Sequence, residues 1–178
     1  MLLVPVKIKG FALCLMLIAL AFFGLPVYAD SVWVSQLQNE VTLGQVDKIK
    51  EDLIAAEKSG AALFVLRIDT PGGAMEATRI LVQAILDSQV PVAAYVAPAG
   101  ARASSAGTYI LSAAHIAAMS PATNIGSAKP VVLSFGDVDE DMKQKLENDA
   151  AAQLRALAQL RGRNANWLTE SVTEAENI

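Results

Sequence analysis

A run of apolar residues, Leu63–Ile68, broken only by Arg67, is followed closely by the turn-forming sequence Thr70–Gly73, and the two together set the strongest constraint on the fold. Strands of a parallel sheet read as uninterrupted apolar runs, because helices cover the sheet. Proline and paired glycines end regular structure and favour a tight turn. We therefore predict a buried parallel strand that ends in a glycine turn, and Pro91–Val96 predicts a second buried strand.

Helical segments alternate with these apolar runs along the chain. Apolar spacing and composition predict helices over Gly44–Ser59, Ala74–Ser88, Ser105–Ala114 and Asp139–Arg161, with a further helix starting near Asn164–Trp167. Short strands are predicted at Ser31–Val41 and Ile116–Met119, and loops at Pro98–Arg102 and Thr123–Val132. This alternation favours an α/β fold with a mostly parallel sheet and right-handed crossovers.

The N-terminus is typical of a secretory signal peptide. Lys7 and Lys9 precede the apolar run Phe11–Leu25, and small residues follow it up to Ala29. The run of about 15 residues is short for a membrane span, which needs roughly 20. We predict cleavage after Ala29, which leaves a domain over 30–178, with an uncleaved anchor as the alternative.

Charge and composition exclude several classes of function. Removal of Lys7 and Lys9 makes the net charge of −4 more negative by two, which argues against a nucleic-acid partner. The only cysteine, Cys14, lies in the predicted signal peptide, so the exported chain has no thiolate chemistry. One histidine and no exported cysteine leave no ligand set for zinc, and we expect neither a metal nor a cofactor.

Two adjacent serines are candidate nucleophiles. Ser105 directly precedes Ala106 and Gly107, where small residues leave a turn open to substrate, and Ser104 is its rival. Either hydroxyl can also cap the helix that follows, and a serine at a helix start can both cap and react. A serine hydroxyl attacks a carbonyl only when a base takes its proton.

The base for such a serine is either histidine or lysine. His115 lies in an apolar strand entry, where a structural role is favoured. A lysine amine, with a reference pKa of about 10.4, acts as a base only when burial beside apolar groups lowers that pKa. Lys145 follows Met142 and precedes Leu146, whereas Lys143 lies on a more polar side of the helix. Composition alone favours a solvated role for Lys145.

Acyl transfer also needs amide donors for the developing oxyanion. Gly73 can supply one, because a residue without a Cβ lets substrate approach its backbone. The backbone N–H of Ala106, directly after Ser105, can supply the other. A plain β-turn is the alternative for the glycines, and the turn lacks the Gly-Lys-Ser/Thr ending of a phosphate-binding loop.

Taken in order, these segments resemble the NfeD family of ClpP-class membrane serine proteases. The resemblance runs from about residue 60 to Ile178 and rests on the order of Asp69–Gly73, Ala103–Tyr109, Lys145–Asn148 and Arg161–Asn164. It implies a ClpP/crotonase-like fold of repeated ββα units, shortened here at the C-terminus. It also selects Ser105 as nucleophile and Lys145 as base, and it implies hydrophobic substrates, a stomatin-like membrane partner and a homodimer or higher oligomer.

The resulting hypothesis is an exported, membrane-associated serine endopeptidase that uses a Ser105–Lys145 dyad. A signal peptide peptidase of the same fold class is one alternative. A second is a non-catalytic scaffold of a membrane-protein quality-control complex. A crotonase-like acyl-CoA enzyme would need the oxyanion amides without the dyad, and the predicted export signal argues against CoA as a substrate.

Overall fold

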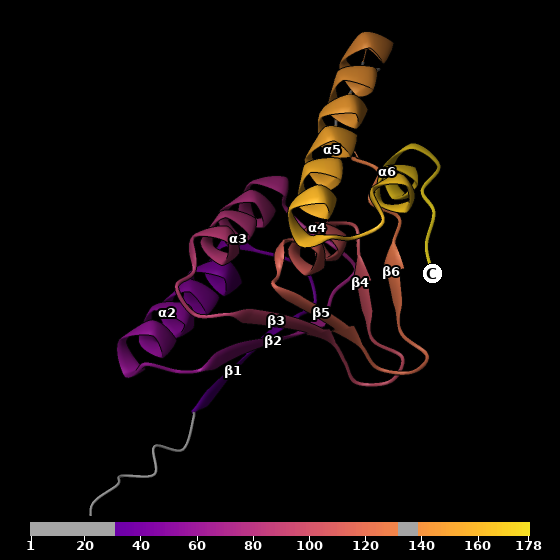
Figure 1. Ribbon diagram of the computed structural model, residues 1–178. Helices are drawn as coiled ribbons and strands as arrows, with labels where there is room; N and C mark the ends of the chain where they lie inside the picture. Colours follow the sequence, from indigo (N-terminus) through magenta and orange to yellow (C-terminus); the bar gives the residue numbers. More distant parts are fainter. Residues whose placement is uncertain (1–30, 132–138) are drawn as a thin grey trace, which may run out of the picture. The chain divides into compact units, whose positions relative to one another are not determined.

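Four parallel strands form the main sheet, in the order β1-β2-β3-β5 (Figure 1). The computed structural model describes residues 31–131 and 139–178, so the predicted signal peptide lies outside the described residues. The strands of the main sheet are β1 (Val32–Gln38), β2 (Leu63–Asp69), β3 (Val92–Val96) and β5 (Ile116–Met119). A second parallel pair joins β4 (Arg102–Ser104) to β6 (Asn124–Gly126). The predicted parallel α/β architecture is confirmed.

Five described helices follow these strands and lie largely on one side of the main sheet (Figure 1). They are α2 (Leu43–Ser59), α3 (Met75–Asp87), α4 (Ala106–Ala113), α5 (Glu140–Arg161) and α6 (Ala165–Thr173). Each agrees with a predicted helix to within a residue or two. The helix ends follow local chemistry, since Thr42 caps the start of α2 and glycines in the left-handed conformation end both α2 and α5.

The core lies between the helices and one face of the sheet. Along β2, Phe64, Leu66 and Ile68 are buried, while the residues between them are only partly covered. The main sheet is therefore covered on one face within the described residues, not on both as a continuous apolar run predicts. Its other face still carries apolar side chains, with Val32 and Val34 of β1 more than half exposed.

Two short strands that the sequence did not predict bring the glycine turn to the serine. The strands β4 and β6 have three residues each, and their pairing crosses a long stretch of sequence, so no local pattern reveals them. An isolated parallel bridge joins Thr70, just after β2, to Ala103 of β4. The Thr70 N–H donates to the Arg102 carbonyl at 2.7 Å, and the Ser104 N–H donates to the Thr70 carbonyl at 3.1 Å. This bridge sets the end of β2 beside the start of α4.

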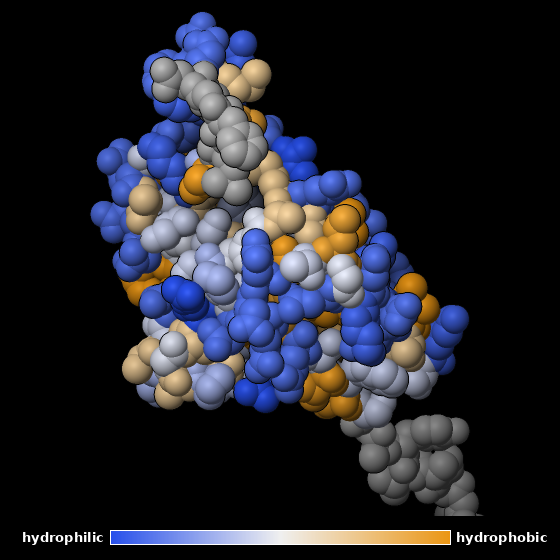
Figure 2. Space-filling view, turned by 180° about the vertical axis from the view of Figure 1, so that it is seen from behind, coloured by the Kyte–Doolittle hydropathy of each residue, from blue (hydrophilic) through white to orange (hydrophobic). Residues whose placement is uncertain are grey.

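The face of the molecule drawn in Figure 2 is mainly hydrophilic, with separate apolar patches. Figure 2 shows several such patches on one face, each bordered by hydrophilic residues. Within 31–131 and 139–178, no helix combines the length and apolar character needed to cross a membrane.

Leu154 and Leu160 lie on the same helix, α5, and differ almost completely in burial. Leu154 is fully buried, whereas Leu160 is 62% exposed. We expect Leu154→Ala to lower the free energy of unfolding by about 2–5 kcal/mol, because it leaves a cavity in the core. The matched Leu160→Ala is expected to change it by less than about 0.5 kcal/mol. Urea unfolding followed by circular dichroism measures both, and equal losses would contradict the described packing of α5.

Candidate active site

Ser105 occupies a sharp turn between β4 and α4. Its backbone has a φ of 51° and a ψ of −113°, a combination that L-residues rarely adopt. The Ser105 N–H donates to the Gly126 carbonyl at 2.9 Å, which holds this turn against β6. Below it, the buried Thr108 hydroxyl accepts from the Gly126 N–H at 3.2 Å and lies 3.0 Å from the Ala103 carbonyl oxygen. Strain of this kind persists only where the surroundings over-determine it.

Gly72 packs directly against this serine. An added Cβ at Gly72 would lie 2.8 Å from the Ser105 Cβ, 3.2 Å from its Oγ and 3.6 Å from the Ala106 nitrogen. The glycine has a φ of 123°, and its N–H donates to the Thr70 hydroxyl at 3.1 Å. The close approach shows that the turn at 70–73 and the serine form one site. Sequence reasoning singled out Gly73 here and missed Gly72.

Gly73 lies beside Gly72 in a bridge with Val41. The Gly72 carbonyl accepts from the Val41 N–H at 2.8 Å, and the Ala74 N–H donates to the Val41 carbonyl at 3.0 Å. In a parallel bridge of this pattern, the Gly73 N–H points away from Val41. It has no acceptor among the hydrogen bonds of the described residues, and Gly73 lines the same cavity as Ser105.

The Ala106 N–H is a second free donor next to the serine, within the hydrogen bonds of the described residues. Ala106 is the first residue of α4, and the first four N–H groups of a helix have no intrahelical acceptor. The helix start also carries a partial positive charge, which favours a negative charge that develops nearby. Gly107 lets α4 come this close, because a Cβ there would lie 2.8 Å from the Thr70 Cγ2.

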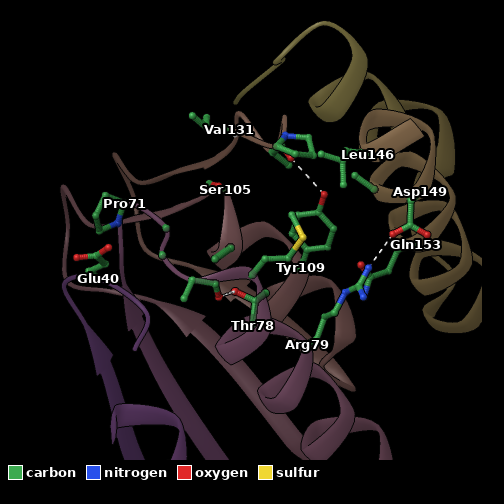
Figure 3. Close-up of a pocket in the computed structure, with 18 residues that line it drawn as sticks. Glu40, Pro71, Thr78, Arg79, Ser105, Tyr109, Val131, Leu146, Asp149 and Gln153 are labelled. Carbon is green, nitrogen blue, oxygen red and sulfur yellow. Dashed lines mark hydrogen bonds and ion pairs between the residues drawn. The ribbon is translucent and has the colours of Figure 1, made fainter. Parts of the chain in front are cut away.

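A cavity of about 540 Å³ opens over Ser105, between the glycine turn, α3 and α5 (Figure 3). Most of its lining is apolar, from residues such as Pro71, Met75, Tyr109, Val131 and Leu146. At one side the Arg79 guanidinium donates to the Asp149 carboxylate at 2.7 Å and joins α3 to α5. The cavity therefore offers a serine hydroxyl and backbone amides within a mainly apolar wall.

Tyr109 contributes a donor to this wall and cannot serve as a base. Burial, with the nearby Asp149 charge, raises the pKa of its hydroxyl to about 12. The neutral hydroxyl donates to the Ala128 carbonyl at 3.2 Å. This bond holds the segment 128–131 in place, and Ala128, Pro130 and Val131 of this segment line the cavity.

Within a single copy of the chain, Lys145 does not line this cavity. It lies on α5 next to Leu146, which lines the cavity, but its own side chain is exposed and is not part of the lining. The expectation that apolar neighbours bury Lys145 is therefore not met within the described residues, because the first turns of α5 project beyond the core (Figure 1). Met142, its apolar neighbour in sequence, is itself 49% exposed.

The rival candidates lie away from the cavity. Ser104 belongs to β4 and does not line the cavity. The Nδ1 atom of His115 accepts from the Val92 N–H at 3.1 Å, and desolvation together with the Arg161 charge lowers its pKa. The predicted structural role of His115 agrees with this contact. Within 31–131 and 139–178, no cluster of His, Cys, Asp or Glu side chains could hold a metal ion.

The positive φ at Ser105 makes a prediction about stability. Ser105→Gly and Ser105→Ala both remove the hydroxyl, but only glycine relieves the strain of the positive φ. We expect Ser105→Gly to have a free energy of unfolding about 1 kcal/mol above that of Ser105→Ala. Urea denaturation of both variants measures the difference, and an alanine variant of equal or greater stability would refute the strained turn.

Gly72 and Gly100 provide a matched pair for the close approach. Both have positive φ, but an added Cβ at Gly100 meets nothing within 4 Å. We expect Gly72→Ala to lower the free energy of unfolding by at least about 1 kcal/mol more than Gly100→Ala, because only the former collides with Ser105. The comparison is made by chemical denaturation. Similar losses for the two variants would mean that Gly72 does not pack against the serine.

Comparison with known proteins shows which family the chain belongs to. The family described as NfeD1b, N-terminal domain, matches residues 31–177. A membrane-bound protease of Pyrococcus horikoshii is 37% identical over 163 residues, which cover 90% of this chain and 37% of that protein. The membrane protein NfeD1b of Bacillus subtilis is 32% identical over 146 residues, which cover 79% of this chain and 32% of that protein. The chain spans about a third of the length of these curated relatives.

Solved structures of a membrane-bound stomatin-specific protease have the same fold. A serine-to-alanine mutant gives a TM-score of 0.79 at 33% identity, covering 85% of this chain and 74% of that one. A lysine-to-alanine mutant in complex with a substrate peptide gives a TM-score of 0.77 at 33% identity, covering 85% of this chain and 70% of that one. ClpP1 from Listeria monocytogenes gives 0.63 at 15% identity, covering 82% and 81%, which shows the fold alone. The chain has a ClpP-like α/β fold, and it belongs to the NfeD1b N-terminal domain family.

Proposed function

We propose that this chain is a serine endopeptidase in which Ser105 attacks the scissile carbonyl and Lys145 acts as the base. The observation that carries the proposal is the strained Ser105 turn, packed on Gly72 and opening into an apolar cavity. A serine on such a turn between strand and helix presents its Oγ to a substrate, as nucleophile elbows do. Relatives solved as serine-to-alanine and lysine-to-alanine mutants support the pair of residue types.

The oxyanion donors are the N–H groups of Gly73 and Ala106. Both residues line the cavity with Ser105, and neither amide has an acceptor among the hydrogen bonds of the described residues. As Ser105 Oγ bonds to the carbonyl carbon, the carbonyl oxygen becomes negative and accepts from these two donors. The neutral amine takes the serine proton and returns it to the leaving amine, so that an acyl-enzyme remains for water to hydrolyse.

Between the two serines, geometry favours Ser105. In the related protease, the replaced serine and lysine lie one position further apart than Ser105 and Lys145 lie here, a spacing that matches Ser104 instead. Ser104, however, lies within β4 and outside the cavity lining, whereas Ser105 lines the cavity directly. We therefore keep Ser105 as the nucleophile and Ser104 as its rival.

The exposed position of Lys145 favours a functional unit larger than one chain. An amine serves as a general base only in its neutral form, which burial away from water favours. Over residues 140–149 of α5, only Leu146 and Glu147 are partly covered. We propose that a second copy, in a homodimer or higher oligomer, covers this part of α5, desolvates Lys145 and brings it to Ser105.

The apolar cavity wall suits hydrophobic stretches of polypeptide as substrate. The related protease is described as stomatin-specific and membrane-bound, which supports a stomatin-like membrane protein as partner and substrate here. The signal peptide predicted over 1–29 supports a location on the extracytoplasmic side of a membrane. A non-catalytic scaffold is the second candidate. The exposure of Lys145 is the observation that favours it, because a scaffold needs no Ser-Lys dyad.

Cleavage of a fluorogenic hydrophobic peptide by the full chain tests this mechanism. Ser105→Ala is expected to lower kcat by about 10⁴-fold or more, because the nucleophile is lost. Lys145→Ala is expected to lower it by about 10²–10⁴-fold, the usual contribution of a general base.

Two control variants make this test specific. Lys143→Ala removes a charge two residues from Lys145, where Lys143 pairs with Glu140 at 2.6 Å, and it should retain the activity. Ser104→Ala should also remain active. Full activity of Ser105→Ala would refute the mechanism. A folded but inactive parent chain, in monomeric and self-associated samples alike, would favour the scaffold.

A further inference from the structure

Two arginines from the α5–α6 turn hold the far end of the helix that carries Ser105. Arg163 donates from Nη1 to the Ser112 carbonyl at 2.7 Å and from Nη2 to the Ala114 carbonyl at 2.9 Å. Arg161 donates from Nε to the Ala113 carbonyl at 2.8 Å. Three successive carbonyls at the end of α4 thus accept from residues 48 to 51 positions away in sequence.

The C-terminus of α4 has no local cap that would make these contacts redundant. Its cap residue, Ala114, is extended, and the last turn has no basic residue of its own. Carbonyls at a helix end need donors, and the partial negative charge there attracts cations. A left-handed glycine would satisfy the same carbonyls. Unlike the arginines, however, it would not attach α4 to another helix.

The turn that carries the arginines is itself rigidly built. Gly162 ends α5 in the left-handed conformation, with a φ of 65°, and the Arg163 N–H donates to the Ala158 carbonyl at 2.8 Å. The Asn164 side chain then caps α6 by accepting from two backbone amides at 3.1 Å. Consecutive caps on both sides fix where each guanidinium points.

The arginines are committed to these carbonyls rather than to acidic partners. Neither takes part in an ion pair among the described residues. Desolvation, followed by repulsion from Arg161, lowers the pKa of Arg163, so bringing the two cations together is unfavourable in itself. Charge-assisted hydrogen bonds to the helix carbonyls offset this cost.

We infer that Arg161 and Arg163 are positioning residues that set the place of α4, and with it Ser105 and the Ala106 amide, relative to α5. The inference rests on the proposed function of Ser105. Neither arginine lines the cavity, and an eight-residue helix spans about 12 Å, so they act through α4 and touch no substrate. We call these contacts of Arg161 and Arg163 with the end of α4 the clamp. Because α5 also carries Leu146 and Lys145, the clamp fixes these two residues relative to Ser105.

The test compares Arg163→Ala and Arg163→Lys with Arg155→Ala, a change at an exposed arginine of α5, all in the full chain. The first readout is the rate constant for labelling of Ser105 by a fluorophosphonate probe. We expect Arg163→Ala to lower it by roughly tenfold to a hundredfold, since a small misplacement of a reacting group has effects of this size. The labelling rate constant of Arg163→Lys should lie between those of Arg163→Ala and the parent, and that of Arg155→Ala should equal the parent's. In peptide cleavage, kcat should fall while KM stays unchanged.

A merely structural role would lower the final extent of labelling instead, because the unfolded fraction would not react. Hydrogen exchange of the α4 amides supplies a readout that needs no activity, and Arg163→Ala should speed exchange there more than in α2. If the parent chain is not labelled, the proposed function fails while hydrogen exchange still tests the clamp. An unchanged labelling rate constant, or unchanged α4 exchange, in both Arg163 variants would overturn the inference.

Discussion

Ser105 joins β4 to α4 with a backbone conformation that costs about 1–3 kcal/mol in a residue with a Cβ, and the surrounding chain is arranged to hold it there. The Gly126 carbonyl accepts its N–H, and Gly126 is in turn tied to the Thr108 hydroxyl in the first turn of α4. Gly72 leaves room for the serine side chain from the opposite side. The result is an Oγ that projects toward the cavity instead of folding back onto its own helix.

Close backbone contacts extend this arrangement through the site. Gly73 lies so near Val41 that an added Cβ would be 2.4 Å from its backbone nitrogen, and Gly107 lies tightly on Thr70. Through these contacts the end of β2, the segment after β1 and the start of α4 converge at one edge of the sheet. Side chains larger than hydrogen at these positions would separate the amides from the serine, which is why the turn needs glycine there.

The sequence predicted those parts of the fold that local pattern encodes. Helical spacing located α2 and α5 well, because burial of one face repeats over several turns. The strands β4 and β6 were missed, since three residues carry no periodicity and their pairing depends on distant segments. Ser105 was identified as a candidate nucleophile, although the same pattern also fits a helix cap. Its positive φ could not be predicted, because it depends on the contact with Gly126 in β6, which is distant in sequence. Composition alone favoured a solvated Lys145, which agrees with its exposure, whereas the requirement for a buried base could not be checked because neighbours in sequence do not reveal how far α5 projects from the core.

The charges around the cavity also bear on how the proposed site would select a substrate. Arg79 and Asp149 neutralise each other across the gap between α3 and α5, and an exposed pair of this kind contributes little to stability. Pairing leaves Glu40 as the charged side chain of the described lining that has no ion-pair partner among the described residues. An apolar side chain can enter the wall made by Met75, Tyr109 and Leu146 at little cost, whereas a charged one would lose its hydration there.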